Sequence, residues 1–183
     1  MGSIQLKIDA NIILKLSTLE HAEKLYGVID RNRSQLSEYL PWVSNMQSLK
    51  DYKTFLQNAE QLFKEEKGIG FTIFYQGNPV GNIGLYHINA SNKTASIGYW
   101  LDENVVGKGI VIKSCAKLID YGFQDLKLNR IEIKAAVNNH RSQAIPKRLN
   151  FKMEGILREA EFVNNSFLDL YLFSLLKNEW INH

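Results

Sequence analysis

The feature that most limits how this chain can fold is a pair of glycines between a predicted strand and a predicted long helix. Residues 94–101 alternate between two faces, as in a strand, with one face made of Ala95, Ile97, Tyr99 and Leu101 and the other of Ser96, Gly98 and Trp100. After Val106-Gly107-Lys108-Gly109-Ile110, apolar residues recur with the helical period to about residue 124. The first N–H groups of a helix lack intrahelical partners and lie at the positive end of its dipole. This turn therefore suits a phosphate group, although a flexible turn without a ligand fits the spacing equally well.

Two common phosphate-binding loops do not fit this turn. The chain contains no G-x-x-x-x-G-K-[ST] run, so it has no P-loop. The dinucleotide fingerprint needs a third glycine, and Ile112 stands at that position. The preceding strands are joined mainly by hairpins, which argues against a parallel nucleotide-binding sheet. A different phosphate-bearing cofactor therefore fits better.

The patterns along the rest of the chain predict one α+β unit over residues 1–183. Further helices are predicted at residues 17–33, 34–39, 48–68 and 141–149. Ser17-Thr18-Leu19-Glu20 has the form of a capping box for the first of these, and Asp51 follows Ser48 at the start of the third. Strands are predicted at residues 11–16, 70–75, 80–88, 94–101, 130–137, 153–162 and 167–176. Hairpin turns between them predict a mixed but mostly antiparallel sheet flanked by helices.

Composition excludes several classes of protein. The chain has 22 Lys+Arg and 19 Asp+Glu, and its formal charge of +3 is too small to indicate a dedicated nucleic-acid or membrane surface. No stretch approaches the roughly 18 apolar residues of a membrane span, and the first residues lack the apolar core of a secretory signal. The single cysteine, Cys115, suits a reducing compartment. We therefore expect a cytoplasmic protein.

Two residue types that often carry chemistry are expected to be structural here. Cys115 falls on the apolar stripe of the predicted long helix, so we expect a buried core residue rather than a nucleophile. The four histidines show no metal-ligand spacing and have no cysteine beside them. We therefore expect no metal site.

Three segments, taken in order, resemble the Gcn5-related N-acetyltransferase (GNAT) superfamily. They are the Gly-x-Gly turn after Gly98-Tyr99-Trp100, the segment Asn139-His140-Arg141-Ser142 after the next strand, and the two closing strands. The resemblance covers essentially the whole chain and is strongest to the RimJ/RimL branch, which acetylates the α-amino groups of ribosomal proteins. Glu38-Tyr39-Leu40-Pro41-Trp42 and the tail from Leu157 to Phe162 support that branch. It implies the acyl-CoA N-acyltransferase fold, with acetyl-CoA as co-substrate.

The resemblance also implies a role for particular residues. The backbone of Trp100 and Leu101 would pair with the pantetheine arm of acetyl-CoA, and Asn139 would hydrogen-bond the same arm. Ser142 would lie near the thioester sulfur, and Glu161 would be the general base. The pyrophosphate would be held by the backbone amides of Val106, Gly107, Lys108, Gly109, Ile110 and Val111. The resemblance places Trp42 over the acceptor. Tyr39 and Tyr99 could line the same pocket, since their rings combine a flat surface with a polar edge, although the residues alone equally allow all three to be core.

Two positions depart from the family pattern Arg/Gln-x-x-Gly-x-Gly/Ala. Val106 stands first and removes a side chain that could donate to a phosphate. Val111 stands last and places a branched side chain where close approach is wanted. The backbone donors survive both changes, so we expect acetyl-CoA binding to persist. The alternative that these valines motivate is a CoA-binding sensor or assembly module without catalysis.

Acetyl transfer to an amine needs a neutral nucleophile and a hydrogen bond or proton for the departing thiolate. An α-amino group has a pKa near about 8, so a base of modest strength suffices. On a regular strand Glu159 and Glu161 would share a face about 6.6 Å apart, and partial burial would raise the pKa of either. The residues alone equally allow two solvent-facing carboxylates and, at Ser142, an ordinary helix-start residue. The resemblance favours Glu161 as base and Ser142 as donor to the thiolate.

We therefore predict an enzyme that moves the acetyl group of acetyl-CoA by direct attack to a primary amine. The predicted acceptor is the N-terminal α-amino group of a ribosomal or other protein. A small amine, such as an aminoglycoside, a polyamine or an amino acid, is the enzymatic alternative. Small acetyltransferases often self-associate through their closing strands or early helices, so the resemblance allows a homo-oligomer without any residue here requiring one.

Overall fold

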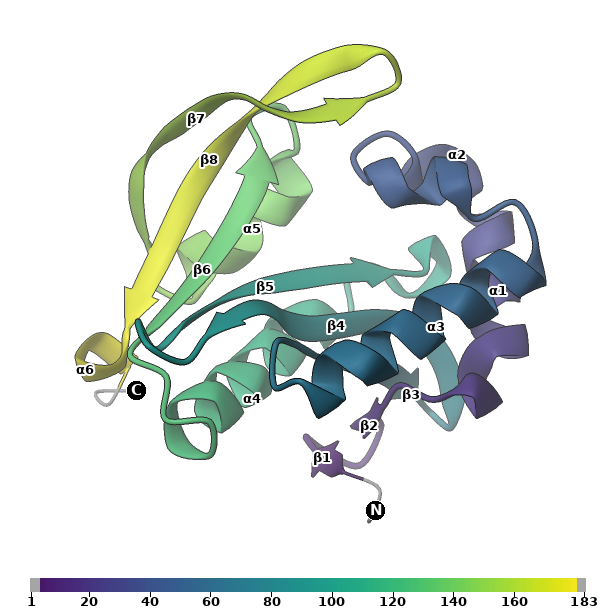
Figure 1. Cartoon of the computed structure of the whole chain (residues 1–183), viewed down its shortest axis with the longest axis horizontal. Coiled ribbons are helices and arrows are strands. Elements are labelled where there is room, and N and C mark those ends of the chain that lie inside the picture. The colour runs from purple at the N-terminus through teal and green to yellow at the C-terminus, as the bar shows by residue number, and fades with distance from the viewer. Residues whose placement is uncertain (1–3, 181–183) are drawn as a thin grey trace.

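A computed structural model describes residues 4–180, in which eight strands form a single sheet of order β1-β2-β3-β4-β5-β6-β8-β7 (Figure 1). All neighbouring strands pair antiparallel except β5 and β6, which pair parallel. The strands are β1 (Gln5–Lys7), β2 (Ile12–Leu16), β3 (Ile69–Tyr75), β4 (Asn78–Asn89), β5 (Thr94–Leu101), β6 (Arg130–Ala136), β7 (Lys152–Val163) and β8 (Ser166–Leu176). The predicted α+β class and mostly antiparallel sheet are confirmed.

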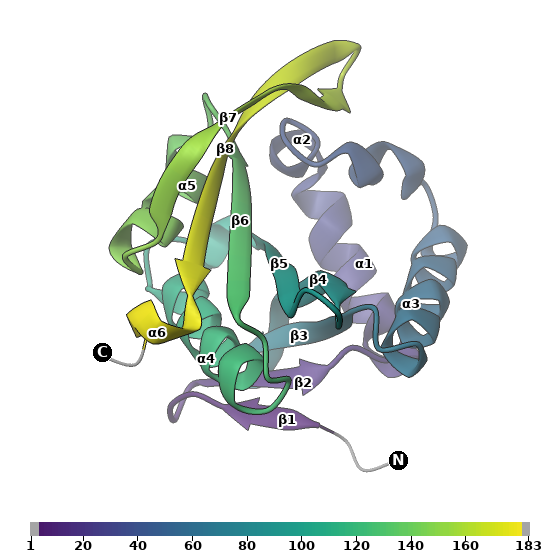
Figure 2. The same cartoon turned by 60° about the vertical axis from the view of Figure 1, so that its left-hand side comes forward.

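Helices cover both faces of the sheet. They are α1 (Ala22–Arg31), α2 (Arg33–Leu36), α3 (Leu49–Lys64), α4 (Ile110–Gln124), α5 (His140–Arg148) and α6 (Lys177–Trp180), with short 3-10 turns η1 (Leu19–His21), η2 (Pro41–Asn45) and η3 (Glu103–Val105). Figure 2 shows α4 on one side of the sheet and α1 and α3 on the other. Because a parallel strand pair needs a crossover connection, α4 carries the chain from β5 to β6.

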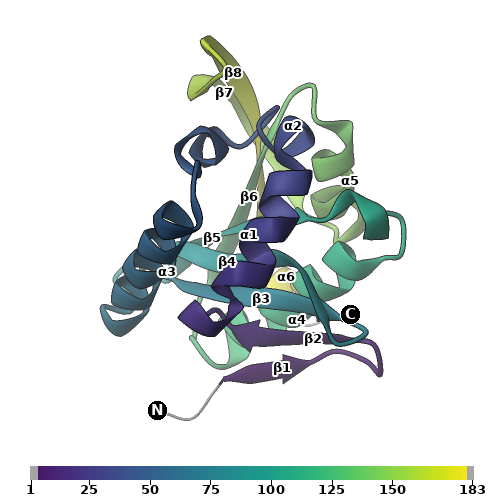
Figure 3. The same cartoon turned by 90° about the vertical axis from the view of Figure 1, so that its right-hand side faces the viewer.

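The core has two parts, one on each face of the sheet. The larger part lies between the sheet and α4, where Cys115, Leu118 and Ile119 are fully buried against strand residues such as Ile83 and Ile131. The smaller part lies among α1, η2 and α3, which Figure 3 shows on the opposite face, and includes Leu25, Val43 and Tyr52. The apolar stripe predicted for the long helix is therefore confirmed, and Cys115 lies in the core as expected.

The parallel pairing between β5 and β6 is short. The two strands are in register only from Thr94↔Arg130 to Ile97↔Ile133, although β5 continues to Leu101 and β6 to Ala136. Beyond Ile97 the strands diverge, and β6, β8 and β7 form a wing turned away from β1–β5 (Figure 1). One edge of the second half of β5 is therefore left without a neighbouring strand, which is what positions the candidate site.

The predicted caps at the two early helices had different outcomes. Ser48 and Asp51 form a capping box at the start of α3, as the sequence indicates. The capping box predicted at Ser17 is wrong, since η1 and then α1 follow with no side-chain cap. Ser17 Oγ instead lies 3.1 Å from Thr72 Oγ1 and accepts a hydrogen bond from Asn82 Nδ2 at 2.9 Å. Its hydroxyl group is used by the sheet rather than by the helix.

None of the helices within residues 4–180 has both the length and the apolar character needed to cross a lipid bilayer.

Candidate active site

The glycine turn before α4 has the backbone geometry that a ligand of the helix end requires. Gly107 and Gly109 have φ values of +85° and +72°, in the left-handed region that L side chains rarely adopt. Gly109 is the residue that precedes α4, and none of the described side chains caps this helix. The first N–H groups of α4 therefore keep their hydrogen-bonding capacity for an anion.

The turn that leads into these glycines is fixed to the end of α1 by a buried carboxylate. Asp102, only 3% exposed, accepts hydrogen bonds from Arg31 and, at 3.0 Å, from Asn32 Nδ2. Asn32 Oδ1 in turn accepts from the backbone N–H of Glu103 at 3.0 Å. Burial by itself raises the pKa of Asp102, but the hydrogen bonds from Arg31 and Asn32 outweigh burial and hold that pKa below its usual range. The charged network thus holds the start of the turn in one position.

The two family departures leave this geometry intact. Val106 is 42% exposed, and its N–H donates to the carbonyl oxygen of Glu103 at 3.2 Å. Val111 packs against the larger core cluster. Lys108 places its Nζ 5.2 Å from the centre of the Tyr75 ring. Because the Val106 N–H is already used, the prediction that it donates to the pyrophosphate is wrong, and the phosphate contacts predicted at this turn depend on the backbone N–H groups of residues 107–111.

The end of β5 is held close to β4 by a glycine. A Cβ atom added at Gly81 would lie 2.3 Å from the carbonyl oxygen of Trp100, so only glycine permits this approach. The backbone of Trp100 and Leu101 lies past the last β5–β6 pair, and could pair with an extended ligand arm. The Trp100 side chain points to the face of the sheet away from α4, where the centres of its ring and the Trp42 ring are 6.2 Å apart.

Asn139 and Ser142 occupy the first turn of α5. Asn139 is the N-cap of this helix, and its Oδ1 accepts a hydrogen bond from the Ser142 N–H at 3.0 Å. The ordinary helix-start interaction is therefore present. Since the side-chain oxygen is committed to the helix, the Nδ2 amide group is the donor that Asn139 can offer to pantetheine.

Tyr99 contacts α5 through its hydroxyl group. Its hydroxyl group donates to the Ser142 carbonyl oxygen at 3.0 Å and lies 3.1 Å from Ser142 Oγ. Tyr99 therefore lies on the other face of β5 from Trp100, whose ring contacts the predicted acceptor residue Trp42. The alternation along β5 contained the signal, because Tyr99 shares the core-facing side of the strand with Ala95 and Ile97, while Trp100 faces the other way.

Glu161 lies on β7 of the wing and interacts with Lys134 of β6, the strand on the far side of β8. It is half-buried, and burial raises the pKa of its carboxyl group despite the opposing charge of Lys134. A carboxylate with a raised pKa has the property needed in a general base at neutral pH.

The prediction that Glu159 and Glu161 share one face of a regular strand is wrong. Leu157 pairs with Leu170 and Glu161 with Leu168, so residues 158–160 bulge opposite a single residue of β8. Glu159 is exposed and left-handed at φ +50°, and its N–H donates to Asp169 Oδ1 at 2.8 Å. The bulge interrupts the strict alternation and leaves Glu161 as the more buried of the two.

The predicted acceptor residues lie on the segment between α2 and α3. Trp42 stacks on Phe55 of α3 with ring centres 6.1 Å apart and also contacts Trp100. Tyr39 precedes it and is partly exposed. The tip of the β7–β8 hairpin reaches this segment, where Asn164 Nδ2 donates to the Ser37 carbonyl oxygen at 2.9 Å (Figure 1). The segment with Tyr39 and Trp42 and the hairpin with Glu161 therefore adjoin each other.

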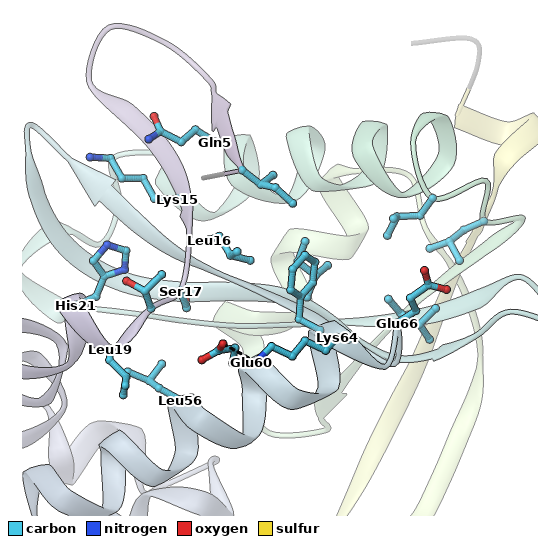
Figure 4. A pocket seen from close by; sticks show the side chains of 18 of the residues that line it. Gln5, Lys15, Leu16, Ser17, Leu19, His21, Leu56, Glu60, Lys64 and Glu66 are labelled. Atoms are coloured by element: carbon cyan, nitrogen blue, oxygen red, sulfur yellow. Dashed lines mark ion pairs between the residues drawn. The ribbon is translucent and has the colours of Figure 1, made fainter. Parts of the chain in front are cut away.

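Among residues 4–180, neither a reactive thiol nor a metal centre adds to this site, and a cavity lies apart from it. Burial raises the pKa of the Cys115 thiol, which keeps it protonated in the core, and residues 4–180 contain no cluster of three or more His, Cys, Asp or Glu that could hold a metal ion. A cavity of about 1230 Å³ lies between β2, α3 and the loop before β6, where Figure 4 shows Leu16, Leu56 and the Glu60–Lys64 ion pair. None of the predicted site residues lines it.

Comparison with known proteins decides the family. The family described as "Acetyltransferase (GNAT) domain" matches residues 11–152. The chain belongs to the GNAT acetyltransferases. Its enzymatic class is therefore acetyl-CoA-dependent acyl transfer, with acetyl-CoA as co-substrate, as the sequence resemblance implied.

Individual relatives agree with this assignment. This acetyltransferase is 37% identical to "Putative ribosomal N-acetyltransferase YdaF" of Bacillus subtilis (strain 168), covering 95% of this chain and 96% of that protein. It is 33% identical to "Ribosomal-protein-serine acetyltransferase" of Escherichia coli (strain K12), covering 92% and 94%. The solved structure of RimL, a ribosomal L7/L12 α-N-protein acetyltransferase in complex with coenzyme A, superposes with a TM-score of 0.93 at 26% identity, covering 96% of this chain and 99% of that one. The predicted RimJ/RimL-type fold is confirmed.

Proposed function

We propose that this acetyltransferase acetylates the N-terminal α-amino group of a ribosomal protein, with Glu161 as the general base. The observation that carries the proposal is the half-buried Glu161 carboxyl group, whose pKa burial raises, on a hairpin that adjoins the predicted acceptor residues. The acceptor class is supported by the names of two similar proteins, which specify a ribosomal-protein serine and a ribosomal α-N-protein acceptor.

The reaction removes two protons from the acceptor nitrogen and exchanges one bond. Glu161 takes the first proton from the acceptor ammonium group and passes it to water, and the neutral nitrogen attacks the acetyl carbonyl carbon. The C–N bond forms, the now cationic nitrogen loses its second proton to Glu161, the C–S bond breaks, and the electron pair stays on the CoA sulfur as a thiolate. Because an α-amino group has a pKa near about 8, Glu161 needs only a modestly raised pKa to act.

The residues around the end of β5 and the starts of α4 and α5 would bind acetyl-CoA and would not take part in proton transfer. The backbone N–H groups of residues 107–111 would hold the pyrophosphate, and the end of β5 with Asn139 would hold the pantetheine arm. Ser142, at the start of α5, would donate a hydrogen bond to the developing thiolate. The Asn139 cap fixes the backbone from which the Ser142 hydroxyl group projects.

The central test compares Glu161→Gln with Glu159→Gln. We expect Glu161→Gln to lower turnover at pH 7 by about 10²–10⁴-fold, the range of general base catalysis, with the acetyl-CoA dissociation constant unchanged. Glu159→Gln is the matched control, since it removes an exposed carboxylate from the same strand and should leave turnover unchanged. Wild-type turnover in Glu161→Gln would refute the assignment of the base.

The pH dependence of turnover provides a second test of Glu161. A carboxyl group acts as a base only above its pKa, so turnover should fall as the pH decreases through the raised pKa of Glu161. This acidic limb should lie higher than for an ordinary glutamate and should disappear in Glu161→Gln. An acidic limb that is the same in both proteins would assign it to another group.

The acceptor is tested by competition. A short peptide with a free N-terminal serine, the same peptide blocked at its N-terminus but carrying a lysine, and spermidine are offered together with limiting acetyl-CoA. We expect the free α-amine to be acetylated first. Preferential acetylation of spermidine would overturn the protein-acceptor proposal and support a polyamine acetyltransferase, while acetyl-CoA binding without acetylation of any amine would support a sensor.

The setting of the enzyme follows from this acceptor. We place it in the cytoplasm, where ribosomal proteins are available, without a nucleic-acid or membrane partner of its own. Self-association into a homo-oligomer stays a prediction, which light scattering coupled to size-exclusion chromatography would test.

A further inference from the structure

The hydroxyl group of Tyr99 connects β5, which carries the predicted pantetheine contacts Trp100 and Leu101, to α5, which carries Ser142. It lies 3.0 Å from the Ser142 carbonyl oxygen and 3.1 Å from Ser142 Oγ. The Ser142 N–H is held separately by Asn139 at 3.0 Å. All three polar groups of Ser142 are therefore positioned, and two of them by the same phenol.

The two hydroxyl groups allow two hydrogen-bond arrangements. Each has one O–H donor and can also accept. In the first, Tyr99 donates to the Ser142 carbonyl oxygen, and Ser142 Oγ donates to Tyr99. In the second, Tyr99 donates to Ser142 Oγ, which frees the serine O–H to point elsewhere. Both need only rotation of hydroxyl hydrogens, because the oxygen atoms are already within hydrogen-bond distance.

We propose that Tyr99 is a positioning residue for catalysis, and that it donates to Ser142 Oγ while Ser142 donates to the thiolate of departing CoA. The inference rests on the proposed role of Ser142. In a chain of hydrogen bonds each donor strengthens the next, so a Tyr99 donor makes Ser142 a better donor to the sulfur.

Tyr99 acts in this arrangement without ionising. Burial raises the pKa of its phenol, so the proton stays on the oxygen at every pH at which the enzyme works. No bond of Tyr99 forms or breaks during transfer. The sulfur carries the electron pair from the broken C–S bond, Ser142 stabilises it by a hydrogen bond, and the thiolate takes its proton from water after release.

The contact with Ser142 gives a reason for a tyrosine rather than a phenylalanine at position 99. The side of β5 that bears Tyr99 otherwise carries Ala95 and Ile97, which are buried in the core. A phenylalanine would fill the same space, so packing alone does not require the hydroxyl group. The hydrogen-bond partners of the Tyr99 hydroxyl group are both atoms of Ser142.

The test is a double-mutant cycle of Tyr99→Phe and Ser142→Ala, with kcat, the KM for acetyl-CoA and the melting temperature measured for each protein. We expect Tyr99→Phe to lower kcat by about tenfold, the scale of one hydrogen bond to a charged system, with KM unchanged. In the Ser142→Ala background the same change should lower kcat no further. Tyr121→Phe is the control, since it removes a hydroxyl group from α4 on a half-buried tyrosine that contacts Phe71.

The outcomes separate this inference from the proposed function. Wild-type kcat in Tyr99→Phe, with a lower kcat in Ser142→Ala, would overturn the role of Tyr99 and leave that of Ser142. An equal fall for Tyr99→Phe in both backgrounds would also overturn it, because Tyr99 would then act through packing. Wild-type kcat in Ser142→Ala would overturn the role of Ser142 and the Tyr99 inference with it.

Discussion

The two sides of the diverging strands are built by different means. On the cofactor side, the geometry belongs to the backbone: Gly107 and Gly109 are left-handed, Gly81 admits the Trp100 carbonyl group, and a buried Asp102 fixes the turn. On the acceptor side, Glu161 lies on a bulged hairpin whose tip is tied to the rest of the molecule by the Asn164 side chain. A co-substrate shared by a whole family is suited to backbone recognition, whereas side chains on a hairpin can change with the acceptor.

The largest effect is expected from replacing the left-handed glycines, because backbone recognition of acetyl-CoA should then be lost. In a Gly107→Ala, Gly109→Ala double variant each alanine would cost about 1–2 kcal/mol in this conformation, so the turn should rearrange. At 1,000 times its dissociation constant, acetyl-CoA should stabilise the wild type by about 4 kcal/mol, and we expect this stabilisation to be lost. Thermal shift measurements with acetyl-CoA, CoA, ATP and NAD side by side would check both affinity and selectivity.

The control for this variant is Gly27→Ala. Gly27 lies within α1, and an added Cβ would have nothing within 4 Å. This change should raise the melting temperature, because alanine is favoured over glycine in a helix by about 1 kcal/mol, and it should not alter the acetyl-CoA shift. An unchanged acetyl-CoA shift in the double glycine variant would show that the turn does not bind the co-substrate.

The second prediction concerns the charge that holds the turn. Asp102→Asn should lower the free energy of unfolding at pH 7 by about 1–3 kcal/mol, since it weakens hydrogen bonds to a buried group, and it should also weaken acetyl-CoA binding. The native pKa of Asp102 is depressed, so its stabilisation is present above the unfolded value of about 3.9 and is lost as the pH falls through the native pKa. The difference between the wild type and Asp102→Asn should therefore shrink in acid, as chemical denaturation at several pH values would measure.

Asp30→Asn is a matched control for this effect. Asp30 pairs with Arg33 at 3.1 Å near the same end of α1, but its side chain is 61% exposed. Exposed ion pairs contribute about 0–1 kcal/mol, so the variant should stay near the wild type in stability and acetyl-CoA affinity. Equal losses in the two variants would mean that the Asp102 network has no special role in the turn.

The cofactor side could be predicted from sequence because its signals are local. The strand, the two glycines and the helical stripe lie within residues 94–124, and the Ser48–Asp51 capping box needs only four consecutive residues. The Ser17 capping box failed because the partners of Ser17, which are Thr72 and Asn82, come from strands more than 50 residues away. A local motif cannot show that its side chain has a distant partner.

The acceptor side was predicted less well for a related reason. The bulge that separates Glu159 from Glu161 depends on the carboxylate of Asp169, which lies on the next strand and accepts the Glu159 N–H. On the cofactor side, the contact between Tyr99 and Ser142 likewise joins positions 43 residues apart. In both cases the residue types are visible in the sequence, but the pairing is decided by tertiary structure.

The smallest expected effect tests the tie between the hairpin and the acceptor segment. Asn164→Asp removes the Nδ2 donor to the Ser37 carbonyl oxygen and keeps a residue that tolerates the left-handed φ of +50°. The matched control is Asn165→Asp, which makes the same change of charge at φ +60° beside the Asn164 donor. Because an exposed hydrogen bond contributes about 0.5–1 kcal/mol, Asn164→Asp should raise the KM for a peptide acceptor by about two- to fivefold. Acetyl-CoA affinity and the melting temperature should match those of Asn165→Asp. If both variants raise the peptide KM equally, the charge at the hairpin tip, and not the hydrogen bond to Ser37, affects acceptor binding. If only Asn164→Asp raises it, this one hydrogen bond holds the hairpin in place for acceptor binding. The acceptor side is then the adjustable half of the enzyme.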